Sequence, residues 1–166
     1  MIFVTIGNAT QGFRRLLDAV DILAGDGFLG YEQVFIQTGH NRDFNPQHCK
    51  YRPFLSMDEF QKWMEKATLI ICHGGCGTLL HSVRLRKVPV AMPRRKKYGE
   101  HVNDHQVQLV QALAAEGRVI PAYEPEDLPN AIAEARRRAT QPKPPQPSGM
   151  IELVAQAVTE LAGEKR

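Results

Sequence analysis

Residues 69–106 read LIICHGGCGTLLHSVRLRKVPVAMPRRKKYGEHVNDHQ, and this stretch decides how the rest of the chain can fold. The apolar run 69–72 ends at His73, three glycines follow, and a helical pattern opens at Thr78. That order is typical of a buried parallel strand entering a βα loop. A second apolar strand is expected at 88–92. Because neighbouring βα loops of a parallel sheet end at the same edge, we expect both loops to border one crevice.

The composition is that of an ordinary globular domain. The chain has 166 residues, with 43% hydrophobic and 23% charged residues, which suits one hydrophobic core. A net charge of +3 is too small to indicate a nucleic-acid partner. There is no signal-peptide pattern and no run of about 18 apolar residues. The three cysteines, Cys49, Cys72 and Cys76, are irregularly spaced, so we expect a reducing, cytoplasmic setting without disulfides.

Short apolar strands alternate with amphipathic helices along the chain. Strands are expected at 2–7, 33–39, 51–55, 69–72, 88–92 and 118–121, and helices at 13–25, from 56 onward, 78–86, 103–115 and 126–138. Ser56 and Glu59 have the spacing of a capping box. The alternation predicts an α/β fold with a doubly wound parallel sheet of the Rossmann type.

The expected Rossmann-like domain covers residues 1–140, and a different kind of sequence follows it. Residues 141–148, QPKPPQPS, cannot form a regular helix and predict a semi-rigid spacer. An amphipathic helix is expected within 149–166. Such a helix either packs on its own domain, the commoner outcome, or reaches toward a partner.

The polar residues after the two central strands suit a phosphate-bearing ligand. Backbone N–H groups from Gly74 to Thr78, at a helix start, can hold a diphosphate. Arg94 or Arg95 on the next loop can stabilise a departing nucleoside diphosphate. Side chains able to bind sugar or phosphate oxygens, or to move a proton, are His73, His101, Asn103, Asp104, His105 and Gln106.

Simpler interpretations remain open beside this one. A glycine-rich turn before a helix is common for packing reasons alone, and HGGCGT is neither a Walker A loop nor a dinucleotide fingerprint. The basic loop 94–97 is equally consistent with a solvated surface. A zinc site of Cys72, His73, Cys76 and His81 matches no standard ligand spacing, so we expect no metal.

Five signatures together resemble a known family. They are MIFVTIG at 1–7, FIQTG at 35–39, ICHGGCGTLLHSV at 71–83, KVPVAMPR at 87–94 and EHVNDHQ at 100–106. In this order they resemble the C-terminal-type domain of family 28 glycosyltransferases, which have the GT-B fold. The chain is most similar to free-standing donor-binding subunits of split enzymes, such as the PssE- or EpsE-type subunits of exopolysaccharide glycosyltransferases. The small subunit of the eukaryotic dolichol-linked N-acetylglucosaminyltransferase is also similar.

The resemblance implies a two-component enzyme. Such subunits bind a UDP-sugar as donor substrate, without a further cofactor, and are active only beside a membrane-anchored partner. The partner carries the acceptor-binding half for a lipid-diphosphate-linked sugar, which implies a peripheral position at the inner face of the membrane. A non-catalytic nucleotide-sugar-binding or regulatory subunit that retains the fold is the alternative.

The resemblance also implies site residues. For the donor these are Gly7, Phe54, His73, Gly74, Gly75, Gly77, Thr78, His81 and Arg94, and for the transfer step Asp104, His105 and Gln106. Phe54 falls where the family places backbone against the uracil. His81 stands where family members usually carry a glutamate for the ribose hydroxyls, and Asn8 stands where threonine is common.

Overall fold

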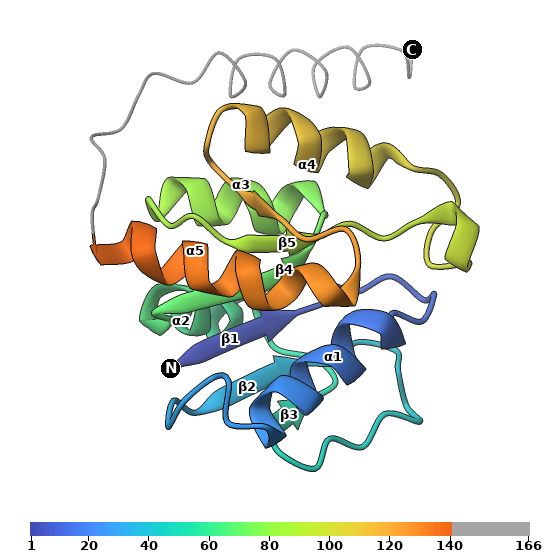
Figure 1. Ribbon diagram of the computed structural model, residues 1–166. Coiled ribbons are helices and arrows are strands. Elements are labelled where there is room, and N and C mark those ends of the chain that lie inside the picture. The colour runs from blue at the N-terminus through green and yellow to red at the C-terminus, as the bar shows by residue number, and fades with distance from the viewer. Residues whose placement is uncertain (141–166) are drawn as a thin grey trace.

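The strands form one parallel sheet at the centre of the molecule. The computed structural model describes residues 1–140 (Figure 1), and its strands are β1 Ile2–Thr5, β2 Val34–Gln37, β3 Lys50–Arg52, β4 Leu69–His73, β5 Val90–Met92 and β6 Ile120–Pro121. Their order across the sheet is β3-β2-β1-β4-β5-β6, and every neighbouring pair is parallel. This is the Rossmann order, which confirms the predicted fold class.

Helices cover both faces of this sheet because its strands alternate their side chains between two apolar cores. The helices are α1 Arg14–Gly25, α2 Met57–Lys66, α3 Cys76–Arg84, α4 His105–Ala115 and α5 Leu128–Thr140, with short 3-10 turns η1 Lys96–Tyr98 and η2 Pro125–Asp127. Ile2 and Val4 of β1 pack in the core shared with α1 and α5, whereas Phe3 packs in the core shared with α2, α3 and α4. Successive strand residues point to opposite faces, so one buried strand serves both cores.

The predicted elements differ from the structure mainly at their ends. The strand expected at 51–55 lies at Lys50–Arg52. Pro53 has no N–H for the ladder, and its carbonyl oxygen instead accepts a hydrogen bond from the Gly39 amide at 2.8 Å. The helix expected from Thr78 begins two residues earlier, at Cys76.

The capping box is confirmed. Ser56 Oγ accepts a hydrogen bond from the Glu59 amide at 3.2 Å, and Glu59 Oε2 accepts one from the Ser56 amide at 3.0 Å. The helix that follows buries Met64, and the Trp63 ring stacks on Phe35 with 3.9 Å between centroids. The cap therefore fixes the start of a helix that closes one core.

The spacer expected at 141–148 and the helix expected within 149–166 lie outside the described residues. Within residues 1–140, none of the helices has the length and apolar character needed to cross a membrane.

Replacing Ser56 tests the cap. Ser56→Ala is expected to lower the free energy of unfolding by about 1 kcal/mol, because the Glu59 amide loses its acceptor. Denaturant unfolding followed by circular dichroism measures this loss. Ser56→Thr keeps the oxygen and is the matched control. An unfolding midpoint that stays unchanged in Ser56→Ala would contradict the assignment.

Candidate functional site

The carboxyl ends of β1 and β4 meet where the strand order reverses direction. The register pairs Thr5 with Cys72, so the loops that follow these strands leave the sheet at the same level. His73 Nδ1 lies 3.4 Å from the Thr5 carbonyl oxygen and links the two strand ends. Ligands of open α/β sheets bind in the crevice at such a switch point. This is the edge at which the sequence predicted a site.

The His73 ring is buried between two glycines. Only 9% of this residue is exposed. A Cβ atom on Gly7 would lie 2.6 Å from His73 Nε2, and one on Gly75 would lie 2.1 Å from it. Gly7 also has a positive φ of 70°, which side chains rarely adopt. Packing against His73 is therefore a reason for both glycines that the sequence did not reveal.

The environment of His73 keeps its ring neutral at physiological pH. Burial, together with the nearby charge of Arg94, lowers the pKa of His73 from 6.5 to about 4. The contact with the Thr5 carbonyl assigns the ring proton to Nδ1. Nε2 then offers a lone pair and has no hydrogen-bond partner among the described residues. An anion bound beside it would favour protonation, so this atom can accept or donate.

The start of α3 offers free backbone amides beside His73. The N-cap residue is Gly75, with no side-chain cap and no acidic residue in the first turn. Cys76 and Gly77 are exposed, and a Cβ atom on Gly77 would meet nothing within 4 Å. The open space over Gly77 and the positive end of the helix dipole suit a bound phosphate.

Gly74 and Thr78 lie deeper in the same turn. A Cβ atom on Gly74 would lie 3.0 Å from both Gln106 Cβ and Val110 Cγ2, so close packing of α4 accounts for this glycine. Thr78 is buried, and its carbonyl accepts a hydrogen bond from Ser82 Oγ at 3.0 Å. Gly77 is thus the member of the predicted glycine loop without a packing neighbour.

The structure gives Arg94 a different setting from the predicted one. Its side chain is 0% exposed, and the guanidinium donates to backbone carbonyls and lies 4.8 Å from the Phe13 ring centroid. The sequence had placed this charge beside a diphosphate. A group that is fully covered and bound to carbonyls does not face a ligand on the surface, so Arg94 is not placed to contact a diphosphate directly.

Three of the remaining predicted residues, Asp104, His105 and Gln106, lie at the start of α4. Gln106 Oε1 accepts a hydrogen bond from the Arg94 amide at 3.1 Å, which brings the start of α4 to the site. His105 and Asp104 are exposed, and Asp104 Oδ1 accepts from the Lys96 amide at 2.9 Å.

Phe54 precedes α2, and His81 lies in α3. Phe54 is 47% exposed and meets the His40 ring edge to face, with 4.9 Å between centroids. His81 is half-buried against the Phe60 ring at 5.9 Å. No hydrogen bond or ring contact joins either residue to His73 within the described part of the chain.

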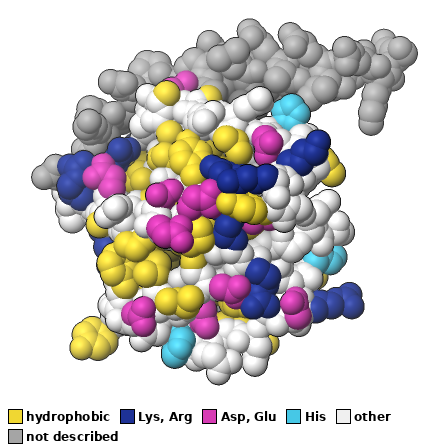
Figure 2. All heavy atoms as spheres, turned by 45° about the vertical axis from the view of Figure 1, so that its right-hand side comes forward, with side chains coloured by type: hydrophobic (Ala, Val, Ile, Leu, Met, Phe, Trp, Pro, Cys, Tyr) yellow, Lys and Arg dark blue, Asp and Glu magenta, His cyan; other side chains and the backbone are white. Residues whose placement is uncertain are grey.

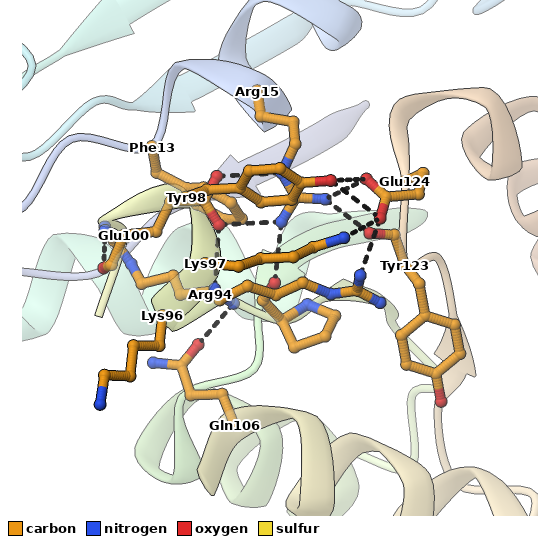
Figure 3. A network of polar contacts seen from close by, with 12 residues as sticks. Phe13, Arg15, Arg94, Lys96, Lys97, Tyr98, Glu100, Gln106, Tyr123 and Glu124 are labelled. Atoms are coloured by element: carbon orange, nitrogen blue, oxygen red, sulfur yellow. Dashed lines mark hydrogen bonds and ion pairs between the residues drawn. The ribbon is translucent and has the colours of Figure 1, made fainter. Parts of the chain in front are cut away.

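The basic loop after β5 is tied to carboxylates that the sequence reasoning missed. Arg15 Nη2 donates to Glu100 Oε2 at 2.9 Å, and Arg95 Nη1 donates to Glu124 Oε1 at 2.7 Å (Figure 3). Tyr98 Oη lies 3.1 Å from the other Glu124 oxygen. Basic and acidic side chains are consequently intermixed on this face of the molecule (Figure 2). Their partners are about 30 to 85 positions apart in the sequence, so no local pattern could have paired them.

The cysteines and histidines of the zinc alternative do not converge. Cys72 packs in the core with α2 and α3, whereas Cys76 is exposed at the start of α3. Residues 1–140 contain no group of three His, Cys, Asp or Glu side chains that could hold a metal ion.

Glycine replacements separate packing from ligand contact. Gly75→Ala is expected to lower the free energy of unfolding by about 1–3 kcal/mol, because the new Cβ would overlap the His73 ring. In a His73→Ala background the same change should cost much less. Gly77→Ala is the matched control in the same loop and should leave stability unchanged or raise it by up to about 1 kcal/mol. Denaturant unfolding of the wild type and the four variants tests this, and an equal cost of Gly75→Ala in both backgrounds would refute it.

The lowered pKa of His73 makes stability depend on pH. Between pH 6.5 and 4 the unfolded chain binds a proton at this residue that the folded chain does not, so acid favours unfolding. The loss starts near pH 6.5, is complete near pH 4, and amounts to at most about 3 kcal/mol.

His73→Asn removes this titration and should show a smaller loss over the same range in urea unfolding. Carboxyl groups with lowered pKa values, such as Glu32 and Glu134, contribute equally to both proteins. Identical pH profiles would show that the ring titrates normally.

Comparison with known proteins places this geometry in a family. The human UDP-N-acetylglucosamine transferase subunit ALG13 is 28% identical over 125 residues, which are 71% of this chain and 10% of that protein. The subunit of the same name from Yarrowia lipolytica is 27% identical over 122 residues, which are 68% of this chain and 60% of that protein. The chain thus spans only part of the curated relatives.

A solved structure shares the fold. The crystal structure of the glycotransferase of kitacinnamycin superposes with a TM-score of 0.62 at 18% identity, covering 85% of this chain and 35% of that one. Residues 1–161 match the glycosyltransferase family 28 C-terminal domain. The chain described here therefore belongs to the family of glycosyltransferase family 28 C-terminal domains.

Proposed function

We propose that this chain is the UDP-sugar-binding subunit of a two-component glycosyltransferase. Family membership supports transfer of a sugar, and both curated relatives carry the name of a UDP-N-acetylglucosamine transferase subunit. The observation that carries the proposal is the uncapped start of α3 at Gly77, open to solvent and beside the unpartnered Nε2 of His73.

The diphosphate binds at this helix start. Amides of an uncapped first turn attract an anion, and a neutral buried histidine can take up a proton as the anion arrives. The charge is supplied mainly by these groups, because the guanidinium groups of Arg94 and Arg95 are already bound within the protein.

The ends of the donor extend to either side of the diphosphate. The nucleoside lies toward Phe54 and His81, whose exposed or half-buried rings offer stacking and hydrogen-bonding surfaces. The sugar lies toward α4, where Gln106 Nε2 has no partner within residues 1–140 and His105 is exposed. An amide and an imidazole there suit sugar hydroxyls.

The acceptor site belongs to a second protein in this proposal. The crevice is bordered by the loops of one sheet edge only, and a donor lying there would be exposed on its other side. A membrane-anchored partner that carries the acceptor-binding half closes the site and presents a lipid-diphosphate-linked sugar. The chain would then act in polysaccharide biosynthesis, in the cytoplasm and peripherally at the inner face of the membrane, in the manner of exopolysaccharide subunits of the PssE or EpsE type.

One observation favours a second candidate, a non-catalytic subunit that binds a nucleotide sugar. His81 packs on Phe60, and α3 contains no Asp or Glu, so this helix offers no acidic acceptor for ribose hydroxyls. Binding of a UDP-sugar without sugar transfer, measured with the membrane partner present, would support this candidate over the enzyme.

Gly77→Val tests the placement of the diphosphate. Its side chain would fill open space, so the fold should be kept while access to the α3 amides is blocked. We expect calorimetry to show UDP affinity reduced by about tenfold or more, a difference of at least about 1.4 kcal/mol. Thermal unfolding is the control for the fold. Unchanged UDP affinity in the variant would remove the site from this helix start.

A further inference from the structure

We propose that Arg94 is a positioning residue that clamps the β1–α1 loop to the β5–α4 connection and so sets the opening of the donor crevice. The inference rests on the proposed function, because it takes these two segments as the borders of the donor site. Figure 3 shows the side chain lying beneath the network that joins the two segments.

The guanidinium reaches across to the β1–α1 loop at three points. Nη2 donates to the carbonyl oxygen of Ile6 at 2.9 Å, and Nη1 donates to those of Gln11 at 2.8 Å and Gly12 at 3.3 Å. Nη1 also donates to the Glu100 carbonyl at 3.2 Å, within its own connection. One planar group thereby fixes both ends of a loop that starts beside His73.

The backbone of the same residue orients a predicted sugar-facing side chain. The Arg94 amide donates to Gln106 Oε1 at 3.1 Å, which leaves Gln106 Nε2 available to a ligand. A Cβ atom on Gly74 would also lie 3.0 Å from Gln106 Cβ, so Gln106 packs against the loop after β4. Movement of Arg94 would therefore shift the α4 side of the crevice as well as the β1 side.

The chemistry of this site favours a clamp over a phosphate-binding group. Both terminal nitrogens donate to carbonyl oxygens and the side chain is fully covered, so the guanidinium faces the protein interior rather than a diphosphate. Burial lowers the pKa of Arg94 to about 10, which still leaves it charged at neutral pH. Burying a charged group without a carboxylate contact costs free energy. The benefit here is a fixed geometry, because one rigid guanidinium can donate to several carbonyl oxygens at once.

A second connection allows the clamp to be removed without separating the segments. Arg15 of α1 donates to the Pro93 carbonyl at 3.0 Å and pairs with Glu100. Glu100 Oε2 in turn accepts from the Arg95 amide at 3.0 Å. A variant that lacks the Arg94 guanidinium should thus retain the fold while its β1–α1 loop loosens.

The test compares Arg94→Met, Arg94→Lys and the matched control Arg136→Met in the full chain. Arg136 also donates to loop carbonyls, those of Phe28 and Leu29, but at the opposite edge of the sheet. Amide hydrogen exchange of residues 6–13, measured without ligand, shows whether the β1–α1 loop is held in place. Calorimetry with UDP and with UDP-N-acetylglucosamine measures the effect on nucleotide affinity.

We expect both Arg94 variants to exchange faster over residues 6–13 and to bind UDP about tenfold to a hundredfold more weakly, as small misplacements of positioning groups do. Arg94→Lys is not expected to restore slow exchange or UDP binding, because one ammonium group cannot reach the carbonyl oxygens of both segments. Arg136→Met should match the wild type in both measurements.

Three results would overturn the inference. Full UDP binding by Arg94→Lys together with weak binding by Arg94→Met would mean that the charge acts directly. Unchanged exchange over residues 6–13 would mean that no clamp exists, and equal losses in Arg136→Met would mean general destabilisation. If the wild type binds neither nucleotide, the proposed function fails, whereas the exchange comparison still decides whether the clamp exists. If Arg94→Met does not fold, hydrogen exchange of residues 6–13 is compared between Arg94→Lys and the wild type.

Discussion

The side chain of His73 fills a space that exists only because residues 7 and 75 have no Cβ atom. This steric fit brings the loops after β1 and β4 to the sheet edge at a fixed separation, and the α3 amides follow directly from that position. Burial also removes the charge of the ring at neutral pH. The geometry and the protonation state of the candidate site thus have one common origin in the packing of a single aromatic ring.

Part of the charge on the basic loop is paired inside the protein. Glu124 pairs with both Arg95 and Lys97, and Glu100 of the same connection pairs with Arg15. In the proposed function, the oriented peptide dipoles at the start of α3 supply most of the attraction for the diphosphate. Such dipoles act at close range.

The sequence predicted those features that depend on residues close together in the chain. Apolar runs located the strands, Ser56 and Glu59 marked a helix start, and the glycines after His73 marked the turn into α3. It could not reveal the setting of Arg94, because that side chain binds backbone carbonyls some 80 positions away and carbonyls carry no sequence signature. For the same reason no local pattern showed that two of the glycines make room for the His73 ring. The placement of the donor itself stays a prediction.

Interlocking of three positions has an evolutionary consequence. Residues 7, 73 and 75 meet at distances that admit no added carbon atom, so a change at one of them alters which residues are tolerated at the other two. Substitutions at these three positions should therefore occur together during evolution. In lineages that exchanged the histidine for a small residue, Gly75 would be released from purifying selection for packing, whereas the positive φ of residue 7 would still favour glycine there.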